Sequence, residues 1–249
     1  MRYLRPASKL AKSWSRQHTE DSNFFYDLTE GNLQDLGQLL ATVLKLSVQD
    51  IEDFMNELFQ NVYLHDHISK SFSTNRTMRD AKVAYGRRVG WYALIRAMKP
   101  RLVVETGVAQ GVGAIIITSA LKQNANEGFP GQYLGTDIDI NAGELFVAQF
   151  REFGEILYGD SIESLKKITL PIDIFINDSD HSAKYEAEEY ECVKNMLSKN
   201  AIIIGDNSHV TQELSKFSKR NNRSYIFFKE LPVNHWYPGG GIGFSLPKL

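Results

Sequence analysis

The sequence has little cysteine, with Cys192 as the one example among 249 residues. A single cysteine cannot form an intramolecular disulfide or build a cysteine-ligated zinc site alone, so both kinds of scaffold are excluded. The sequence also lacks an excess of one charge, because 28 basic and 30 acidic residues leave a formal net charge of −2. A dedicated nucleic-acid-binding protein usually has a basic excess, so we expect no nucleic-acid partner.

Long hydrophobic runs are missing too. The most apolar stretch, residues 112–121, contains Thr118 and Ser119 and is shorter than the roughly 18 apolar residues that a membrane span needs. The basic segment at residues 1–17 is followed by no apolar run, which argues against a secretory signal. We therefore expect a cytoplasmic protein with no membrane partner. A hydrophobic content of 43% with 23% charged residues is typical of globular domains.

The pattern of the first part of the chain, up to residue 77, predicts helices. Apolar residues recur at helical spacing between Leu33 and Val62, and Ser47 stands three residues before Asp50, which predicts a helix start. The polar stretch 71–77 reads as a linker. We therefore predict a helical N-terminal appendage at residues 1–77. Such an appendage can cover a site or build a homo-oligomer, and the sequence leaves both alternatives open.

From residue 78 the pattern changes to strands that alternate with helices. The expected helices and strands, in chain order, are helix 81–98, strand 101–106, helix 111–123, strand 132–139, helix 141–150, strand 155–160, helix 162–168, strand 172–178, helix 184–197 and strand 201–207. This alternation predicts a parallel sheet covered on both faces, a doubly wound Rossmann-like α/β domain at residues 78–249. Two last strands, 224–231 and 241–246, are too close for a crossover helix, so we expect an antiparallel hairpin at the sheet edge.

In such a sheet, ligands bind outside the carboxyl ends of the strands. A glycine loop with Gly107, Gly111 and Gly113 follows the first strand. Glycines let the backbone approach a ligand closely, and the next helix offers unpaired N–H groups. The spacing G-x-x-x-G-x-G differs from the G-x-G-x-x-G of dinucleotide-binding loops. The alternative is a tight strand-to-helix turn that binds no ligand.

Acids follow the next two strands. Asp137 stands where a carboxylate can accept both hydroxyl groups of a ribose, and Asp139 is the better candidate for a helix cap. Asp160, after the third strand, can accept from an adenine amino group or cap the next helix, and both interpretations stay open.

The fourth and fifth predicted strands end in polar clusters at 177–182 and 205–209. Since these strands should be neighbours, Asp178, Asp206 and Asn207 should meet at one edge of the sheet. Oxygen ligands of this kind favour hard cations such as Mg²⁺, Ca²⁺ or Mn²⁺. The alternative is that these residues are caps and turn formers, which are common after strands.

The motifs ETGVAQGVGA, TDID, GDS, INDSDHS and IIIGDN, in this order, resemble those of the class I S-adenosylmethionine-dependent methyltransferases across residues 78–249. The pair DSDHS and GDN is similar to the metal-dependent O-methyltransferases. The DSDHS form is most similar to the bacterial branch that methylates sugars of natural products, methyltransferase family 24. The resemblance implies S-adenosylmethionine as cofactor, a divalent cation with Mg²⁺ as first choice, and a small-molecule acceptor such as a sugar, polyol or natural-product glycoside.

The resemblance also implies roles for single residues. It implies that the methionine end of the cofactor is held by Glu105, Gly107, Gly111 and Gly113, and that the ribose is bound by Asp137. It further implies that the adenine lies at Asp160 and Ser161, and that Asp180 contacts the cofactor amino group or the substrate.

The remaining implied roles concern chemistry. Asp178, Asp206 and Asn207 match the three metal ligands of the metal-dependent enzymes. His181 stands where the catechol and caffeoyl-CoA enzymes carry a catalytic lysine. This departure argues against catechol chemistry and fits a histidine general base, as in the sugar branch.

Three other functions stay open. One is a metal-independent methyltransferase that relies on His181 alone. Another is a nicotinamide-dependent oxidoreductase on a related sheet, which the glycine spacing and the paired acid clusters disfavour. The third is a non-catalytic protein that binds the cofactor without transfer.

Overall fold

The computed structural model describes residues 26–74, 82–235 and 237–248. The chain forms two compact units, one from residues 1–90 and 229–240 and the other from residues 91–228 and 241–249. The boundary predicted between residues 77 and 78 falls outside the described residues and stays a prediction. Within the described part of the chain, no helix combines the length and apolar character needed to cross a bilayer.

The described residues of the first unit include helices α2 (Glu30–Leu44), α3 (Val48–Phe59) and α4 (Val62–Thr74). Helix α3 begins where the sequence predicts, because Ser47 and Asp50 form a reciprocal capping box. The predicted linker at 71–77 is wrong for residues 71–74, which belong to α4; residues 75–77 lie outside the described residues. Ser71 fits into this helix by donating its hydroxyl hydrogen to Ile68 O at 2.6 Å.

The helix predicted at 81–98 begins later than expected. Helix α5 spans Arg88–Met98, residue 81 lies outside the described residues, and residues 82–87 are not helical. Gly86 explains the late start, because its φ of +52° is left-handed and a right-handed helix cannot continue through it. A Cβ atom at this position would lie 2.7 Å from the ring of Tyr26, so the close approach also needs glycine.

The second unit is built on a seven-stranded sheet of order β3-β2-β1-β4-β5-β7-β6. The strands are β1 (Leu102–Thr106), β2 (Gln132–Asp137), β3 (Gly154–Tyr158), β4 (Ile172–Asn177), β5 (Leu197–Gly205), β6 (Ser224–Lys229) and β7 (Gly241–Leu246). Strands β1 to β5 pair in parallel, and β7 is antiparallel to β5. The predicted Rossmann-like sheet with an antiparallel C-terminal hairpin is confirmed.

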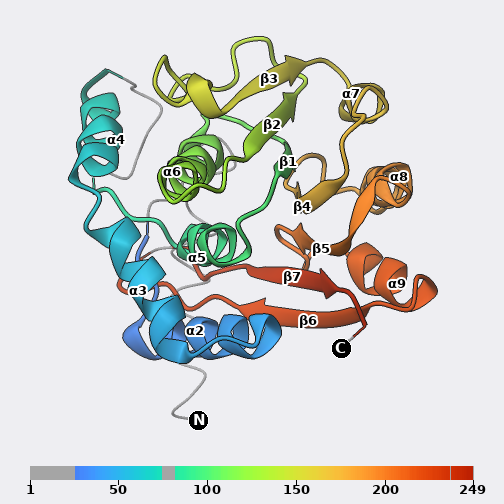
Figure 1. Cartoon of the computed structure of the whole chain (residues 1–249), viewed down its shortest axis with the longest axis horizontal. Helices are drawn as coiled ribbons and strands as arrows, with labels where there is room; N and C mark the ends of the chain where they lie inside the picture. Colours follow the sequence, from blue (N-terminus) through green and yellow to red (C-terminus); the bar gives the residue numbers. More distant parts are fainter. Residues whose placement is uncertain (1–25, 75–81, 236, 249) are drawn as a thin grey trace. The chain divides into compact units, whose positions relative to one another are not determined.

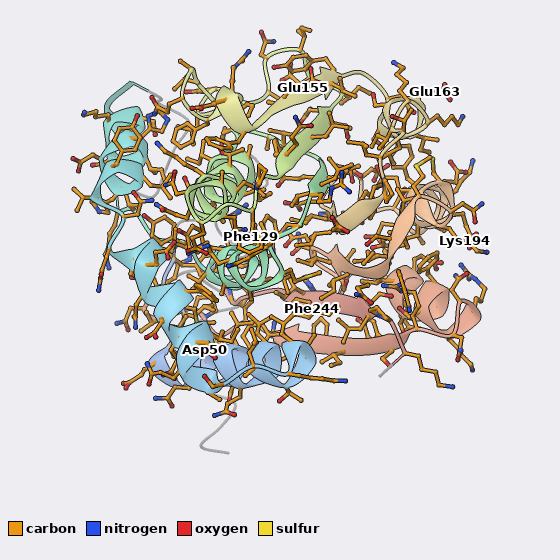
Figure 2. The ribbon with its side chains drawn as sticks, viewed as in Figure 1. Asp50, Phe129, Glu155, Glu163, Lys194 and Phe244 are labelled. Atoms are coloured by element: carbon orange, nitrogen blue, oxygen red, sulfur yellow. The ribbon has the colours of Figure 1, made fainter. Side chains whose placement is uncertain are left out.

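Helices cover both faces of this sheet (Figure 1). On one face, α6 (Val112–Asn126) lies with α5; on the other lie α7 (Ser161–Leu165), α8 (Ala183–Val193) and α9 (Glu213–Arg220). Burial on both faces explains the continuous apolar runs of the central strands. Figure 2 shows the ring of Phe244 inside the domain, whereas Glu155, Glu163 and Lys194 lie at its periphery.

The helix predicted at 141–150 is wrong. Residues 138–153, all described, contain turns and the short 3-10 helix η1 (Arg151–Phe153). The backbone here bonds to the glycine loop after β1 instead of to itself: Gly143 N donates to Ala109 O at 2.7 Å, and Leu145 N donates to Gln110 O at 2.9 Å. This pairing places the β2–β3 connection directly against the loop that the sequence assigns to the cofactor.

Candidate active site

The polar residues named by the sequence lie at the carboxyl ends of strands β1 to β5. Backbone bonds extend the parallel pairing past the strands, because Asp178 N donates to Thr106 O at 2.9 Å and Asp206 N donates to Asn177 O at 2.8 Å. The side chains that follow β4 and β5 therefore start from adjacent, fixed backbone positions.

An acidic cluster results from this register. Asp178, His181 and Asp206 each offer one donor atom, and these atoms lie within 4.8 Å of one another. Asp206 is fully buried, while Asp178 and His181 are partly exposed. Two carboxylates at this distance repel each other unless a cation lies between them, so the arrangement suits a divalent metal ion.

His181 is held from both sides of its ring. Its Nδ1 atom lies 3.4 Å from Oε1 of Glu186, and its Nε2 atom lies 3.2 Å from Nδ2 of Asn207. A carboxylate only accepts and an amide nitrogen only donates, so this geometry places the ring proton on Nδ1 and a lone pair on Nε2. Nε2 lies 3.7 Å from Oδ1 of Asp178, so the lone pair is at the acidic cluster.

Asn207 joins the cluster through its unusual backbone. Its φ of +52° is left-handed, which asparagine tolerates better than most residues. The structure thus brings together all four residues that the sequence assigns to the metal and to catalysis: Asp178, His181, Asp206 and Asn207.

Beside this cluster lies a cavity of about 500 Å³. It is lined by residues from the ends of β1, β2 and β4, from the start of α7 and from α8. Six of them are predicted site residues: Gly107, Asp137, Asp160, Ser161, Asp178 and Asp180. The other lining residues, which the sequence did not single out, are Ala109, Thr136, Ile138, Gly159, Ser179 and Tyr185.

Asp137 is fixed before any ligand binds. Its Oδ2 atom accepts from Val108 N at 3.0 Å and Ala109 N at 2.8 Å, and Oδ1 accepts from Asp139 N at 2.8 Å. A carboxylate has about four lone-pair sites, so one remains for a further donor. Next to it, the buried hydroxyl group of Thr136 has no hydrogen-bond partner among the described residues. A polar ligand in the cavity would suit both groups.

Asp160 caps a helix, which was one of its two predicted roles. Its Oδ1 atom accepts from Glu163 N at 3.0 Å at the start of α7, and its Oδ2 atom accepts from Tyr185 OH at 2.9 Å. The backbone N–H of Glu163 is the main cause that lowers the pKa of Asp160. Because Asp160 also lines the cavity, the cap does not prevent contact with a ligand.

Three predicted cofactor residues do not line this cavity: Glu105, Gly111 and Gly113. Glu105 is buried and accepts from Tyr133 OH at 2.5 Å. A Cβ atom at Gly113 would lie 2.1 Å from Oε1 of Glu105, so the glycine makes room for this carboxylate. Gly111 has a φ of +93° at the start of α6, which only glycine adopts readily.

Two buried acids of α8 were not among the predicted site residues. Glu186 and Glu189 are 2% and 0% exposed and share the buried face of the helix with Tyr190 and Val193. The spacing of these four residues is that of a buried helix face, where apolar side chains are the rule. Carboxylates at two of these positions are therefore the feature of the sequence that could have identified Glu186 and Glu189.

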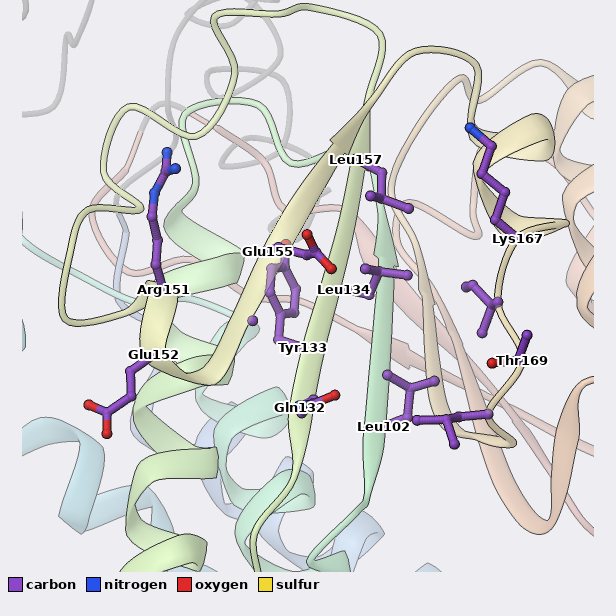
Figure 3. A pocket seen from close by; sticks show the side chains of 13 residues that line it. Leu102, Gln132, Tyr133, Leu134, Arg151, Glu152, Glu155, Leu157, Lys167 and Thr169 are labelled. Carbon is purple, nitrogen blue, oxygen red and sulfur yellow. The ribbon is translucent and has the colours of Figure 1, made fainter.

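A second cavity, of about 620 Å³, opens at the amino ends of β1 to β3 (Figure 3). Leu102, Leu134 and the loop 167–170 line it, and Arg151 and Lys167 lie on opposite sides. It is the larger of the two, yet no predicted site residue lines it. Converging polar groups identify a reactive site better than volume does, so the cavity at the carboxyl ends of the strands is the candidate active site.

Residues 104–208, which include the glycine loop, the cavity and the acidic cluster, match a family described as a methyltransferase domain. This match spans less than half of the chain. The sheet order and the antiparallel C-terminal hairpin are those of the class I methyltransferase fold. No curated protein matches this chain significantly.

Solved structures share the fold. The O-methyltransferase TomG of Streptomyces achromogenes, involved in tomaymycin synthesis and solved with S-adenosylmethionine, is 14% identical with a TM-score of 0.55, and the match covers 76% of this chain and 89% of TomG. An O-methyltransferase of Bacillus cereus, solved with S-adenosylhomocysteine, is 14% identical with a TM-score of 0.54, covering 86% and 97% of the two chains. A methyltransferase of Geobacter sulfurreducens is 19% identical with a TM-score of 0.54, covering 72% and 87%.

Proposed function

We propose that this protein is an S-adenosylmethionine-dependent methyltransferase that methylates a hydroxyl oxygen of a small molecule, such as a sugar, polyol or natural-product glycoside. Asp178, Asp206 and Asn207 would hold a divalent cation, with Mg²⁺ as first choice, and His181 would act as general base. One observation carries the proposal: Asp178 belongs both to the acidic cluster and to the wall of the 500 Å³ cavity. A cofactor in the cavity and an acceptor at the cluster would therefore be neighbours.

The residues of the cavity fit S-adenosylmethionine. Asp137 keeps one acceptor site for a ribose hydroxyl, and the unpartnered hydroxyl of Thr136 is next to it. Ile138 lines the cavity and is 83% exposed, so it offers apolar surface to a planar base. Asp180 also lines the cavity and can accept from the cofactor amino group. Glu105, Gly111 and Gly113 would act from outside this wall, by shaping the loop before α6.

The acidic cluster fits a hard cation that an acceptor molecule shares. A divalent cation bound there would lower the pKa of a coordinated hydroxyl group and orient it. Asp206 and Asp178 supply the negative charge, and the amide oxygen of Asn207 is a neutral ligand. Three protein ligands leave positions open for two adjacent oxygens of a substrate.

His181 would take up the proton. Methyl transfer forms a C–O bond, breaks the C–S bond of the sulfonium and releases the hydroxyl proton. The lone pair on Nε2 would accept this proton once Asn207 Nδ2, which lies 3.2 Å from Nε2, moves away, and Glu186 would keep the ring with Nδ1 protonated. The second proton then lies on a ring that already contacts two carboxylates, Glu186 and Asp178, which stabilise the imidazolium.

The proposal is tested by transfer of a labelled methyl group to a panel of vicinal diols, with Mg²⁺ or with a chelator. We expect label on oxygen in the presence of Mg²⁺ and a strong loss with the chelator. His181→Ala should lower kcat by about 10²-fold or more, whereas His209→Ala, an exposed control, should stay near wild type. Label only on nitrogen or carbon would contradict the proposal, and transfer unaffected by the chelator would favour the metal-independent alternative.

A further inference from the structure

We propose that Glu189 is a positioning residue of the cofactor cavity, holding from within the core the side chains that form its wall. The inference rests on the proposed function, since it concerns how this chain shapes the site for S-adenosylmethionine. Glu189 lies on α8, is 0% exposed and does not line the cavity itself.

Four segments of the active site converge on this one carboxylate. Its Oε2 atom accepts from Thr106 Oγ1 at 3.2 Å and Ser179 Oγ at 2.8 Å, and also from Asn177 Nδ2. Its Oε1 atom accepts from Ser161 Oγ. The donors come from the end of β1, the end of β4, the loop after β4 and the start of α7. Glu189 thus ties together the segments whose ends form the floor of the cavity.

Two of these donors line the cavity directly, namely Ser161 and Ser179. The other two, Thr106 and Asn177, are the last residues of β1 and β4 and are paired with each other in the sheet. They immediately precede Gly107 and Asp178, which also line the cavity. A shift of the carboxylate would therefore move the wall at four places.

Tyr185, one helical turn before Glu189, extends this support. Its hydroxyl oxygen lies 2.9 Å from Ser161 Oγ and donates to Asp160 Oδ2 at 2.9 Å. Residues four apart lie on the same helix face, so Tyr185 and Glu189 hold the first turn of α7 together. The cavity residues Asp160 and Ser161 are consequently fixed by α8 and not by their own short helix.

The chemistry of the carboxylate explains why this position holds glutamate. An ionised carboxylate accepts about four hydrogen bonds, which matches the four donors, all of them neutral groups. Burial raises the pKa of Glu189, which means that burying its charged form costs folding free energy. An apolar residue at the same core position would not have this cost. A glutamine has one acceptor oxygen, and its amide nitrogen can only donate, so at least one serine or threonine hydroxyl would have to turn its own hydrogen away and accept instead. The hydrogen-bond network that fixes the wall would then have to rearrange.

The experiment compares the affinity of the full chain for S-adenosylhomocysteine by calorimetry, alongside thermal unfolding without ligand. The variants are Glu189→Gln and the matched control Glu188→Gln, an exposed glutamate of the same helix. We expect Kd to rise about tenfold or more in Glu189→Gln and to stay within about twofold of wild type in the control. Ser179→Ala should weaken binding too. In the double variant, the loss of affinity should be smaller than the sum of the two single losses and close to that of Glu189→Gln alone, because both substitutions act on one network.

The outcomes separate this inference from the proposed function. If wild type binds S-adenosylhomocysteine and folded Glu189→Gln binds it equally well, Glu189 serves stability alone and the inference is wrong. If wild type does not bind, the proposed function itself fails. Should Glu189→Gln not fold, Ser179→Ala and Tyr185→Phe decide the matter, because each removes one link of the network. Unchanged affinity in both would overturn the inference.

Discussion

Glu186 lies behind His181, with Oε1 of the acid 3.4 Å from Nδ1 of the ring. Glu186 is itself fixed, because its other oxygen, Oε2, accepts a hydrogen bond from the hydroxyl of Thr211. A carboxylate on one ring nitrogen sets the tautomer and leaves the other nitrogen available for chemistry. The pair therefore links α8 to the base that we assign to the reaction.

Replacing Glu186 by glutamine should impair the chemical step. The amide can donate to Nδ1 and so permits the wrong tautomer, and we expect kcat to fall about tenfold or more with the affinity for S-adenosylhomocysteine unchanged. Glu188→Gln on the same helix is the control. Steady-state kinetics and calorimetry on both variants check this, and a loss of cofactor affinity equal to the loss of kcat would argue against it.

Gly107 should be irreplaceable for a steric reason. Its φ is +85°, and a Cβ atom there would lie 2.0 Å from the carbonyl oxygen of Asp178. Gly107→Ala should lower the free energy of unfolding by about 3 kcal/mol, from backbone strain and from overpacking together.

Gly128 provides the matched comparison. Its φ is +89°, but a Cβ atom there would meet nothing within 4 Å. Gly128→Ala should therefore cost only the backbone strain, about 1 kcal/mol. Denaturant unfolding measures both, and equal losses would mean that the contact with Asp178 is not the cause.

How far the sequence predicted the structure depended on the range of the interactions. The capping box of Ser47 and Asp50 is local, and so are the apolar runs of β1, β4 and β5, so both could be read from the sequence. The acids after β4 and β5 could be paired because neighbouring parallel strands end at one edge.

Other features depend on contacts between distant residues. The backbone of Gly143 forms a hydrogen bond with the loop after β1. The sequence of residues 141–150 does not indicate this contact, so a helix was predicted there. The roles of Glu186 and Glu189 likewise follow from partners on other segments. The glutamates at buried positions of α8 could be recognised from the sequence as unusual, but their hydrogen-bond partners could not be predicted from it.

Glu127 should make part of the stability depend on pH. Its Oε1 atom lies 2.5 Å from Arg96 Nη2 and its Oε2 atom 2.9 Å from Lys99 Nζ. The hydrogen bond from Arg96, and next that from Lys99, lowers the pKa of Glu127 from 4.5 to about 2. A depressed carboxylate pKa stabilises the fold above the unfolded value and loses this effect as pH falls through the folded value.

Glu127→Gln should accordingly lower the free energy of unfolding at pH 7 by about 1 kcal/mol, a small effect because solvent screens a side chain that is 42% exposed. The difference from wild type should shrink as pH falls from about 4.5 toward 2. Denaturant unfolding at several pH values measures it, with Glu155→Gln, an exposed acid of β3, as control. A difference that does not change with pH would refute the ionic origin.

The most direct test of the central claim is calorimetric titration with S-adenosylmethionine, with and without Mg²⁺, on wild type and on Asp206→Ala. Asp206 is a buried member of the acidic cluster but does not line the 500 Å³ cavity proposed for the cofactor. Our account predicts that both proteins bind the cofactor and that only wild type shows heat of Mg²⁺ binding. Failure of wild type to bind S-adenosylmethionine would contradict the account, and Mg²⁺ binding that survives in Asp206→Ala would contradict the metal site.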